Sequence, residues 1–324
     1  MSGRSRVAEV GNHHRKPGHA DMLTTGRRPD GRSPTSQCLL ETGSSTVVPG
    51  PSDSMRAALI GLVRRGSRTV LWGTDVAGFA NNLYLWLCAA TSQRSGDATY
   101  VLRREGMATW LKQMPAVDEF LTIDKQHVRF VDQRDLGHHQ VYGVDFGAVD
   151  LRRFIEEFLL PSPLLQGLPR DDDPRRVVLN VRRGDYYSDP VYRGQYSFDI
   201  VEYVRSALEV ARRQHPVDSV HVVSDDIGWC RDRLGWLSTD STTTFAEPGQ
   251  PVNHFREVAG ASRLILANST FSYWAAYVSN VVHGTDPARV IAPWFHNRLS
   301  RHGAAWQLDP RWTVIKEIRG GWDA

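Results

Sequence analysis

The second half of this 324-residue chain alternates short apolar runs with amphipathic stretches, and this alternation constrains the fold more than any other feature. The short runs are rich in valine, isoleucine and leucine, as buried strands are, and each is followed by apolar residues at helical spacing. Strands that alternate with helices form parallel sheets. We therefore predict an α/β fold, with strands at 177–181, 219–226, 242–247, 263–269 and 289–293.

The helices of this half are expected between those strands, at 198–214, 227–234, 252–262 and 271–282. In the first of them, Val201, Val204, Leu208 and Ala211 lie on one helical face, which is the pattern of a helix packed on a sheet. Ser197 is the predicted N-cap of that helix, because a serine hydroxyl can accept a hydrogen bond from a first-turn N–H group.

The first half shows the same alternation less clearly. Its strands are predicted at 68–73, 98–104 and 127–132, and its helices within 83–91, 107–114 and 149–160. A stretch rich in Pro, Gly and Asp at 162–176 reads as a linker. We therefore predict three parts, namely a tail at 1–54, an N-terminal Rossmann-like domain at 55–170 and a C-terminal one at 171–324.

The tail is rich in Gly, Ser, Arg, His, Pro and Thr and has no apolar periodicity. Such a segment cannot bury enough surface to offset its chain entropy, so we expect residues 1–54 to be disordered. His13, His14 and His19 are expected to be solvated rather than to bind a metal. Met55 opens the first stretch with a folding pattern, which leaves open whether the tail belongs to the mature protein.

Charge and cysteine content narrow the class of partner and the compartment. The net charge of +3 is too small to argue for a nucleic-acid partner. The dispersed cysteines Cys38, Cys88 and Cys230 form no CxxC pair and favour a reducing compartment. The sequence contains neither an apolar run of about 18 residues nor a signal-peptide pattern. A cytoplasmic location or peripheral association with a membrane is expected.

Three strand ends of the second half carry polar motifs, and in a doubly wound sheet ligands bind outside the carboxyl ends of the strands. The motifs are RRGD at 182–185, SDD at 224–226 and NSTFS at 268–272. Arginines and a helix start with hydroxyls favour phosphate, and carboxylates can accept hydrogen bonds from a guanine base. Together these motifs predict a site for a guanosine diphosphate.

Metal binding is not predicted. The run Asp171–Asp173 contains a DxD pattern, which many sugar transferases use to hold a metal, but it lies in the polar linker. We interpret it as a solvated charge run, and no cofactor is expected.

The three motifs, in this order, resemble those of the α-1,2-fucosyltransferases of glycosyltransferase family 11. The family's HxRRGDY motif is similar to NVRRGDY at 180–186, its SDDxxWC block to VVSDDIGWC at 222–230, and its ANSTFSWW-type segment to LILANSTFSYWAAY at 264–277. RVIAPWF at 289–295 is similar to the closing strand, and GFANNLYLW at 78–86 to a divergent form of the glycine-rich N-terminal segment.

This resemblance implies a GT-B architecture, in which two Rossmann-like halves face a cleft. It implies transfer of L-fucose from GDP-fucose to a galactoside hydroxyl in α-1,2 linkage, with inversion and without a metal. The implied partners are a GDP-sugar donor and a glycan acceptor. Two alternatives stay open: a GT-B transferase that uses a different GDP-sugar, and a non-catalytic relative that binds nucleotide or carbohydrate.

Carried onto this chain, the resemblance assigns the diphosphate to Arg182 and Arg183, and base or ribose contacts to Asp225 and Asp226. The acceptor's proton would pass to Asp185 or Asp189, which are near the arginines in sequence and between which the sequence does not choose. Asp185 could instead hold the arginine loop, which is the simpler interpretation. The full donor-binding set is Asn180, Arg182, Arg183, Gly184, Ser224, Asp225, Asp226, Asn268, Ser269, Thr270, Phe271 and Ser272.

The resemblance makes the C-terminal domain, 171–324, the one that binds the GDP-sugar, and the N-terminal domain, 55–170, the acceptor side. The loop that approaches donor and acceptor from the N-terminal domain contributes Gly78, Phe79, Asn81 and Asn82. A lipid-linked acceptor would account for peripheral association with a membrane.

Two departures from the family pattern bear on the substrate. Asn180 stands where the family usually has histidine, and an amide can form hydrogen bonds but cannot titrate. The N-terminal loop has Ala77 and Phe79 beside Gly78, and Asn82 in place of the usual glutamine. These changes leave the identity of donor and acceptor open, but they do not affect the predicted fold.

Overall fold

The computed structural model describes residues 68–74, 78–284, 286–299 and 301–323. The tail predicted to be disordered, residues 1–54, lies outside the described residues, as does the start of the predicted N-terminal domain at 55–67.

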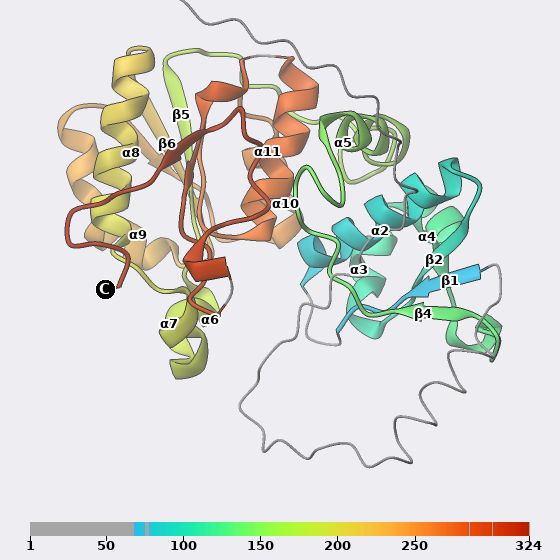
Figure 1. Cartoon of the computed structure of the whole chain (residues 1–324). Coiled ribbons are helices and arrows are strands. Elements are labelled where there is room, and N and C mark those ends of the chain that lie inside the picture. Colours follow the sequence, from blue (N-terminus) through green and yellow to red (C-terminus); the bar gives the residue numbers. More distant parts are fainter. Residues whose placement is uncertain (1–67, 75–77, 285, 300, 324) are drawn as a thin grey trace, which may run out of the picture. The chain divides into compact units, whose positions relative to one another are not determined.

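The N-terminal sheet contains, among the described residues, four parallel strands in the order β3-β2-β1-β4 (Figure 1). The strands are β1 (Arg68–Leu71), β2 (Ala98–Leu102), β3 (Thr122–Ile123) and β4 (Gln133–Asp135). The helices of this half are α2 (Phe79–Arg94), α3 (Ala108–Leu111), α4 (Pro115–Leu121) and α5 (Ala148–Phe154), and α5 continues into a π-helical turn at Ile155–Leu159.

The C-terminal sheet has six described strands, all parallel, in the order β10-β9-β8-β5-β6-β7. The strands are β5 (Arg176–Val181), β6 (Ser219–Ser224), β7 (Thr242–Phe245), β8 (Leu264–Ile265), β9 (Val290–Pro293) and β10 (Thr313–Ile315). If these six are counted from β5, this is the 3-2-1-4-5-6 order of a Rossmann sheet, whose switch point lies between β5 and β8. The α/β class predicted from the sequence is confirmed.

Helices cover both faces of this sheet (Figure 1). They are α8 (Ile200–Gln214), α9 (Ile227–Arg233), α10 (Pro251–Ala259) and α11 (Thr270–His283). The short helices α6 (Gly184–Ser188) and α7 (Pro190–Tyr196) lie beyond the ends of the strands (Figure 1). Alternate side chains of a strand point to opposite faces. Accordingly Leu179 of β5 packs in the cluster formed with α8, whereas its neighbour Val178 packs in the cluster formed with α10 and α11.

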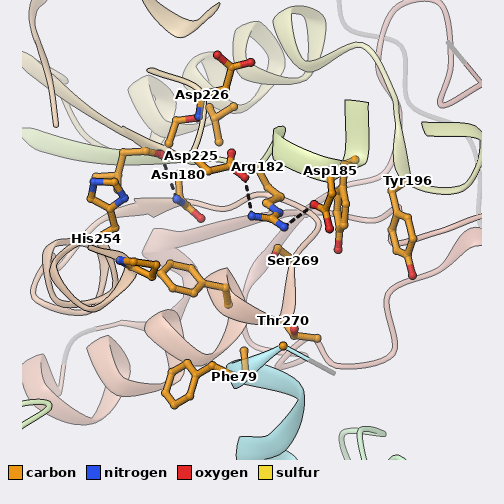
Figure 2. Close-up of a pocket in the computed structure, with 18 of the residues that line it drawn as sticks. Phe79, Asn180, Arg182, Asp185, Tyr196, Asp225, Asp226, His254, Ser269 and Thr270 are labelled. Atoms are coloured by element: carbon orange, nitrogen blue, oxygen red, sulfur yellow. Dashed lines mark hydrogen bonds and ion pairs between the residues drawn. The ribbon is translucent and has the colours of Figure 1, made fainter. Parts of the chain in front are cut away.

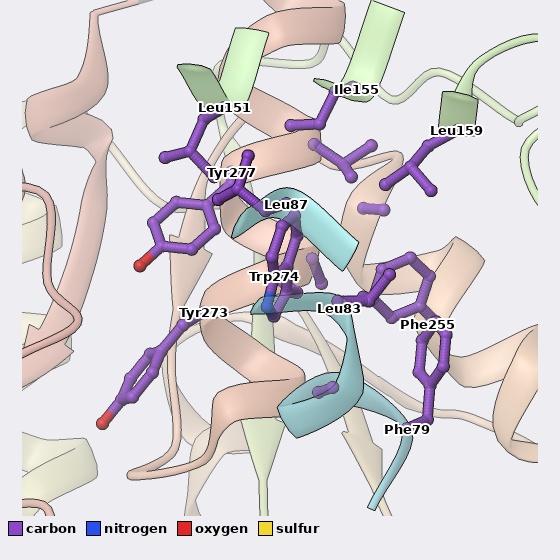
Figure 3. Close-up of a cluster of buried hydrophobic side chains, with 14 of the residues drawn as sticks. Phe79, Leu83, Leu87, Leu151, Ile155, Leu159, Phe255, Tyr273, Trp274 and Tyr277 are labelled. Carbon is purple, nitrogen blue, oxygen red and sulfur yellow. The ribbon is translucent and has the colours of Figure 1, made fainter. Parts of the chain in front are cut away.

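The largest apolar core joins α2 of the N-terminal half to α10 and α11 of the C-terminal half (Figure 3). Trp274 of α11 is fully buried, and its ring lies 5.1 Å from that of Tyr84 and 5.8 Å from that of Phe154, centroid to centroid. Leu83 and Leu87 of α2 belong to the same cluster. The predicted division at residue 170 therefore runs through a shared core, and two independent domains remain a prediction.

The strand predicted at 127–132 is wrong. Residues Lys125–His127 form a 3₁₀ turn, and the strand that pairs with β1 follows at Gln133–Asp135. Asp132 explains the difference, because its buried carboxylate accepts hydrogen bonds from the guanidinium of Arg68 and the backbone N–H of Arg129, and these bonds close a turn. Phe130 is 64% exposed, so the apolar alternation there marks no buried face.

The N-cap predicted at Ser197 is also wrong. Asp199 caps α8, since its side chain accepts a hydrogen bond from the backbone N–H of Glu202. The hydroxyl of Ser197 instead donates to the carbonyl of Arg193, at the end of α7. The sequence analysis did not predict α7, which ends one residue before Ser197.

Candidate functional site

A pocket of about 890 Å³ lies at the carboxyl ends of β5, β6 and β8 (Figure 2). This position is the switch point of the Rossmann sheet, where ligands of such folds bind. The volume is typical of small-molecule sites. Its N-terminal wall comes from the start of α2 and from Trp110, whose ring stacks on Phe79 with centroids 3.6 Å apart.

The structure brings most of the predicted site residues to this pocket. The residues from the prediction that line it are Asn180, Arg182, Asp185, Ser224, Asp225, Asp226, Ser269, Thr270 and Phe271, together with Gly78, Phe79 and Asn81 from the opposite wall. The predicted residues outside the lining are Asn82, Arg183, Gly184, Asp189, Asn268 and Ser272. Each of these six has a structural environment of its own.

Arg182 is held in the pocket by two carboxylates (Figure 2). Its Nη1 donates to Asp225 Oδ2 and its Nη2 to Asp185 Oδ1, both at 2.5 Å. The side chain is 35% exposed. A guanidinium has five N–H donors, so these ion pairs orient the fork and leave donors for an anionic ligand.

Arg183 lies beside the pocket rather than in its lining. Its guanidinium is sandwiched between the rings of Tyr187 and Trp229, at 4.2 and 4.1 Å from their centroids, and its Nε donates to Asp226 Oδ2 at 3.0 Å. The backbone N–H of Arg183 donates to Asp225 Oδ1. These contacts make Arg183 a support for the two carboxylates.

Gly184 is required by close packing. A Cβ atom at this position would overlap Oδ2 of Asp225, the same oxygen that accepts from Arg182. The glycine of the RRGD motif therefore leaves room for the ion pair that orients the pocket arginine.

Asn180 and Ser272 form a buried pair under the pocket. The Asn180 side chain donates to the carbonyl of Val223 at 3.0 Å and accepts from the Ser272 hydroxyl at 2.5 Å. Ser272 is fully buried, so in this structure its hydroxyl orients Asn180 and does not face the pocket.

Asp189 and Asn82 also lie in structural surroundings. Asp189 is the N-cap of α7, since its side chain accepts from the backbone N–H groups of Val191 and Tyr192. Asn82 is 4% exposed within α2, one residue after the pocket residue Asn81.

Asn81 is positioned by a relay of side-chain amides. Gln140 Nε2 donates to Asn81 Oδ1 at 3.2 Å, and Gln307 Nε2 donates to Gln140 Oε1 at 3.1 Å. Gln140 thus fixes the side-chain oxygen of Asn81, a residue that lines the pocket. Gln307 follows the segment at 289–295, the last one for which the sequence analysis found a resemblance.

Asn268 ties the strand end to the neighbouring wall of the pocket. Its side-chain NH₂ donates to the carbonyls of Tyr196 and His296, both at 2.9 Å, and the residue is 1% exposed. The amide is thus fully used inside the protein, and it fixes the end of α7 against β8.

Asn268→Ala should lower the free energy of unfolding by about 2–4 kcal/mol, because two buried carbonyls lose their donor and each such loss costs about 1–3 kcal/mol. Urea titration followed by circular dichroism measures the change. Asn253→Ala, at an exposed position of α10, is the matched control and should stay within about 0.5 kcal/mol of the wild type. Equal free energies of unfolding for the two variants would contradict the structural role assigned to the Asn268 side chain.

Ser269 and Thr270 stand where α11 begins. Ser269 is the N-cap residue and makes no side-chain capping hydrogen bond, and both residues line the pocket. The first-turn N–H groups of a 14-residue helix lack intrahelical partners, so they offer donors to an anion.

Several lining residues were missed by the sequence analysis. Tyrosines at 186, 192 and 196 form one side of the pocket, and Trp110 and His254 contribute on other sides. The sequence analysis predicted no helix between Arg183 and Ser197, a stretch that contains Gly, Asp and Pro. Tyr192 and Tyr196 are four residues apart, a helical spacing that could have revealed α7.

The hydroxyls of Tyr186 and Tyr196 stay neutral near pH 7. Burial raises the pKa of Tyr186 far above its usual value, and burial raises the pKa of Tyr196 as well. A neutral phenol can both donate and accept a hydrogen bond, which suits contact with a polyhydroxylated ligand.

The described part of the chain shows no cluster of three or more His, Cys, Asp or Glu side chains arranged to hold a metal ion. Within the linker run, Asp171 pairs with Arg176 and Asp172 with His283, away from the pocket. Among the described helices, none has the length and apolar character needed to span a bilayer.

Comparison with known proteins finds similarity mainly in the second half of the chain. Residues 165–304 match the model of glycosyl transferase family 11, which confirms the predicted resemblance over this region. Galactoside alpha-(1,2)-fucosyltransferase 1 of Homo sapiens is 31% identical over 112 residues, and its counterpart in Aotus azarae is 30% identical. Each match covers 33% of this chain and 30% of the relative, so the chain matches about a third of these relatives' length.

Solved structures give weaker similarity. Arabidopsis thaliana FUT1, a mutant in complex with GDP, shares 12% identity with a TM-score of 0.36, over 72% of this chain and 73% of that chain. E. coli heptosyltransferase WaaC with ADP shares 11% identity with a TM-score of 0.41, over 76% and 92%. The GT-B-like assignment therefore rests on the two parallel sheets and on the pocket that both halves line.

Proposed function

We propose that this chain is a glycosyltransferase that moves L-fucose from GDP-fucose to a hydroxyl of a galactoside, forming an α-1,2 linkage with inversion and without a metal. One observation carries the proposal. The three motifs in the region that matches family 11 converge on one pocket at the switch point of a Rossmann sheet, with Arg182, Asp225 and Ser269 all in its lining. The named relatives support fucose as the sugar and the α-1,2 linkage.

The arrangement of charge supports the diphosphate of a nucleotide sugar as the ligand. When the bond between the sugar and the β-phosphate breaks, negative charge grows on the leaving diphosphate. The guanidinium of Arg182 and the first-turn N–H groups of α11 are fixed donors beside this position, and preorganised donors stabilise developing charge. Because Asp225 and Asp185 hold Arg182, little reorganisation is needed during the reaction.

Asp185 is the better candidate for the base that takes the acceptor's proton. It lines the pocket and is 48% exposed, whereas Asp189 is engaged as the N-cap of α7. Inversion requires the acceptor hydroxyl to attack C1 of the sugar from the face opposite the leaving diphosphate, so Asp185 would act as base for an acceptor that binds beyond the sugar. A carboxylate in this position can accept a proton from an acceptor hydroxyl as that hydroxyl attacks the sugar.

A donor and acceptor panel tests this function. GDP release is measured with GDP-fucose, GDP-mannose and GDP-glucose, each with and without methyl β-galactoside, and the product linkage is determined by NMR. We expect release with GDP-fucose that depends on the galactoside. If only a different GDP-sugar releases GDP in a galactoside-dependent way, that sugar nucleotide is the donor and the assignment of GDP-fucose is wrong. GDP binding without release from any donor would favour a non-catalytic relative.

Transfer should persist in EDTA, because arginine and helix N–H donors supply the charge stabilisation that other transferases obtain from a metal. Initial rates are compared before and after dialysis against EDTA, and should agree within about twofold. Loss of activity that returns with Mn²⁺ or Mg²⁺ would point to a metal site, and the matched variant Asp171→Asn with Asp173→Asn would show whether the linker run supplies it.

A further inference from the structure

Tyrosine rings from α6 and α7 form a continuous aromatic wall of the pocket, which we call the tyrosine wall (Tyr186, Tyr192 and Tyr196). The rings of Tyr186 and Tyr196 are stacked, with centroids 4.3 Å apart and an angle of 17° between their planes. Tyr192 meets Tyr196 edge-on at 6.2 Å. All three side chains are half-buried, so part of each ring remains open to the pocket.

The tyrosine wall is held rigidly from behind. Asn268 donates to the carbonyl of Tyr196, and the Arg298 guanidinium donates to the carbonyl of Ser197 at 2.8 Å. The hydroxyl of Tyr187 donates to the carbonyl of Phe198 at 2.8 Å. These bonds fix both ends of the α6–α7 pair, so the wall is already formed without a ligand.

The tyrosine wall makes one end of the pocket chemically different from the other. In Figure 2, Arg182 lies between two ends, with Asp185 and Tyr196 on one side and Asp226 and His254 on the other. If the diphosphate binds at Arg182, the nucleoside must extend toward one end and the sugar toward the other. The end with the Ser224–Asp226 loop offers the carboxylates suited to a base or ribose, which leaves the tyrosine wall for the sugars.

The chemistry of the wall fits a galactopyranose ring. In this sugar the axial hydroxyl lies on one face, and C–H groups gather on the opposite face to form an apolar surface. Aromatic faces carry partial negative charge and attract such C–H groups. Neutral tyrosine hydroxyls at the rim can bond the hydroxyls of the ring.

We propose that the tyrosine wall is the acceptor subsite and that it selects a pyranoside ring by stacking, with Tyr196 and Tyr192 as the contacts. This inference rests on the proposed function and adds the part of the pocket that binds the acceptor. The acceptor hydroxyl would then lie beside Asp185, the proposed base, at the same end of the pocket.

The test is the kinetics of Tyr196→Ala and Tyr192→Ala with GDP-fucose and methyl β-galactoside. We expect the acceptor KM to rise roughly tenfold in each variant, with GDP affinity measured by calorimetry unchanged. Tyr196→Phe keeps the ring and should stay within about threefold of the wild type. Tyr192→Ala removes the outer ring without breaking the stack of Tyr186 on Tyr196, so it serves if Tyr196→Ala is unstable. Tyr100→Ala, on β2 outside the pocket, is the matched control and should leave the acceptor KM unchanged.

An acyclic acceptor separates stacking from hydrogen bonding. Galactitol carries the hydroxyls without a ring face, so the wild type should prefer methyl β-galactoside to galactitol, and Tyr196→Ala should lose most of this preference. Unchanged acceptor KM in both alanine variants, or a rise in donor KM instead, would overturn the acceptor subsite while wild-type transfer still upheld the proposed function. A wild-type protein that neither binds GDP nor transfers fucose would overturn the proposed function itself.

Discussion

Arg182→Lys is expected to lower kcat/KM for fucose transfer about a hundredfold. Lysine keeps the charge but loses the planar fork, which in Arg182 is oriented by Asp225 and Asp185. A hydrogen bond between charged groups is worth about 1.5–3 kcal/mol, and about 2.7 kcal/mol corresponds to a hundredfold change in rate. Steady-state kinetics and calorimetric GDP titration measure the loss. The melting temperature should change little, since the side chain is 35% exposed.

Arg183→Lys is the matched control, with the same chemical change one residue away. The sequence analysis assigned both arginines to the diphosphate, but Arg183 lies between Tyr187 and Trp229 outside the pocket lining. We expect this variant to lose thermal stability and to lose less GDP affinity than Arg182→Lys. Near-normal turnover of Arg182→Lys, or a larger loss of GDP affinity in Arg183→Lys, would reverse the two roles.

Trp274→Ala should lower the free energy of unfolding by about 3–5 kcal/mol, the usual cost of removing a large buried aromatic side chain. The ring is fully buried and packs against Tyr84 and Phe154, which precede the linker in sequence. Because the core is shared, we expect a single unfolding transition in which both halves lose structure together. Guanidinium titration followed by circular dichroism and by tryptophan fluorescence measures both quantities.

Trp236→Ala provides the comparison, since Trp236 is only partly buried and stacks with Arg205 at the edge of the other core. The decrease in the free energy of unfolding should be clearly smaller for Trp236→Ala than for Trp274→Ala. Two separate transitions, or a decrease in the free energy of unfolding below about 1 kcal/mol for Trp274→Ala, would argue that the two predicted domains unfold independently.

Much of the fold could be predicted because apolar residues repeat along the sequence with a different period in strands and in helices. The run Val177–Val181 (VVLNV) and the amphipathic stretch after Ser197 each match one period clearly, and both elements are present as β5 and α8. Predictions failed where a turn or a short helix is set by single side chains. Asp132 ends an apolar alternation by closing a turn, and Asp189 starts a helix in a stretch where none was predicted.

The candidate site was predictable to the extent that parallel strands align their carboxyl ends. Three motifs far apart in sequence then had to meet, and Arg182, Asp225 and Ser269 do line one pocket. The different roles of adjacent motif residues could not be predicted, because the side chains of adjacent residues at a strand end point in different directions. For this reason Arg182 faces the pocket while Arg183 stacks between two rings.

By itself, the sequence determined the α/β class, the strand ends that carry the polar motifs and the resemblance to family 11, because these depend on local periodicity and on short contiguous motifs. Only the tertiary structure decided which motif residues reach the pocket, that Asn268 and Ser272 serve the protein interior, and that the tyrosine wall borders the site. These properties depend on contacts between residues such as Asn268 and Tyr196, which are 72 positions apart and meet only when the sheet has formed.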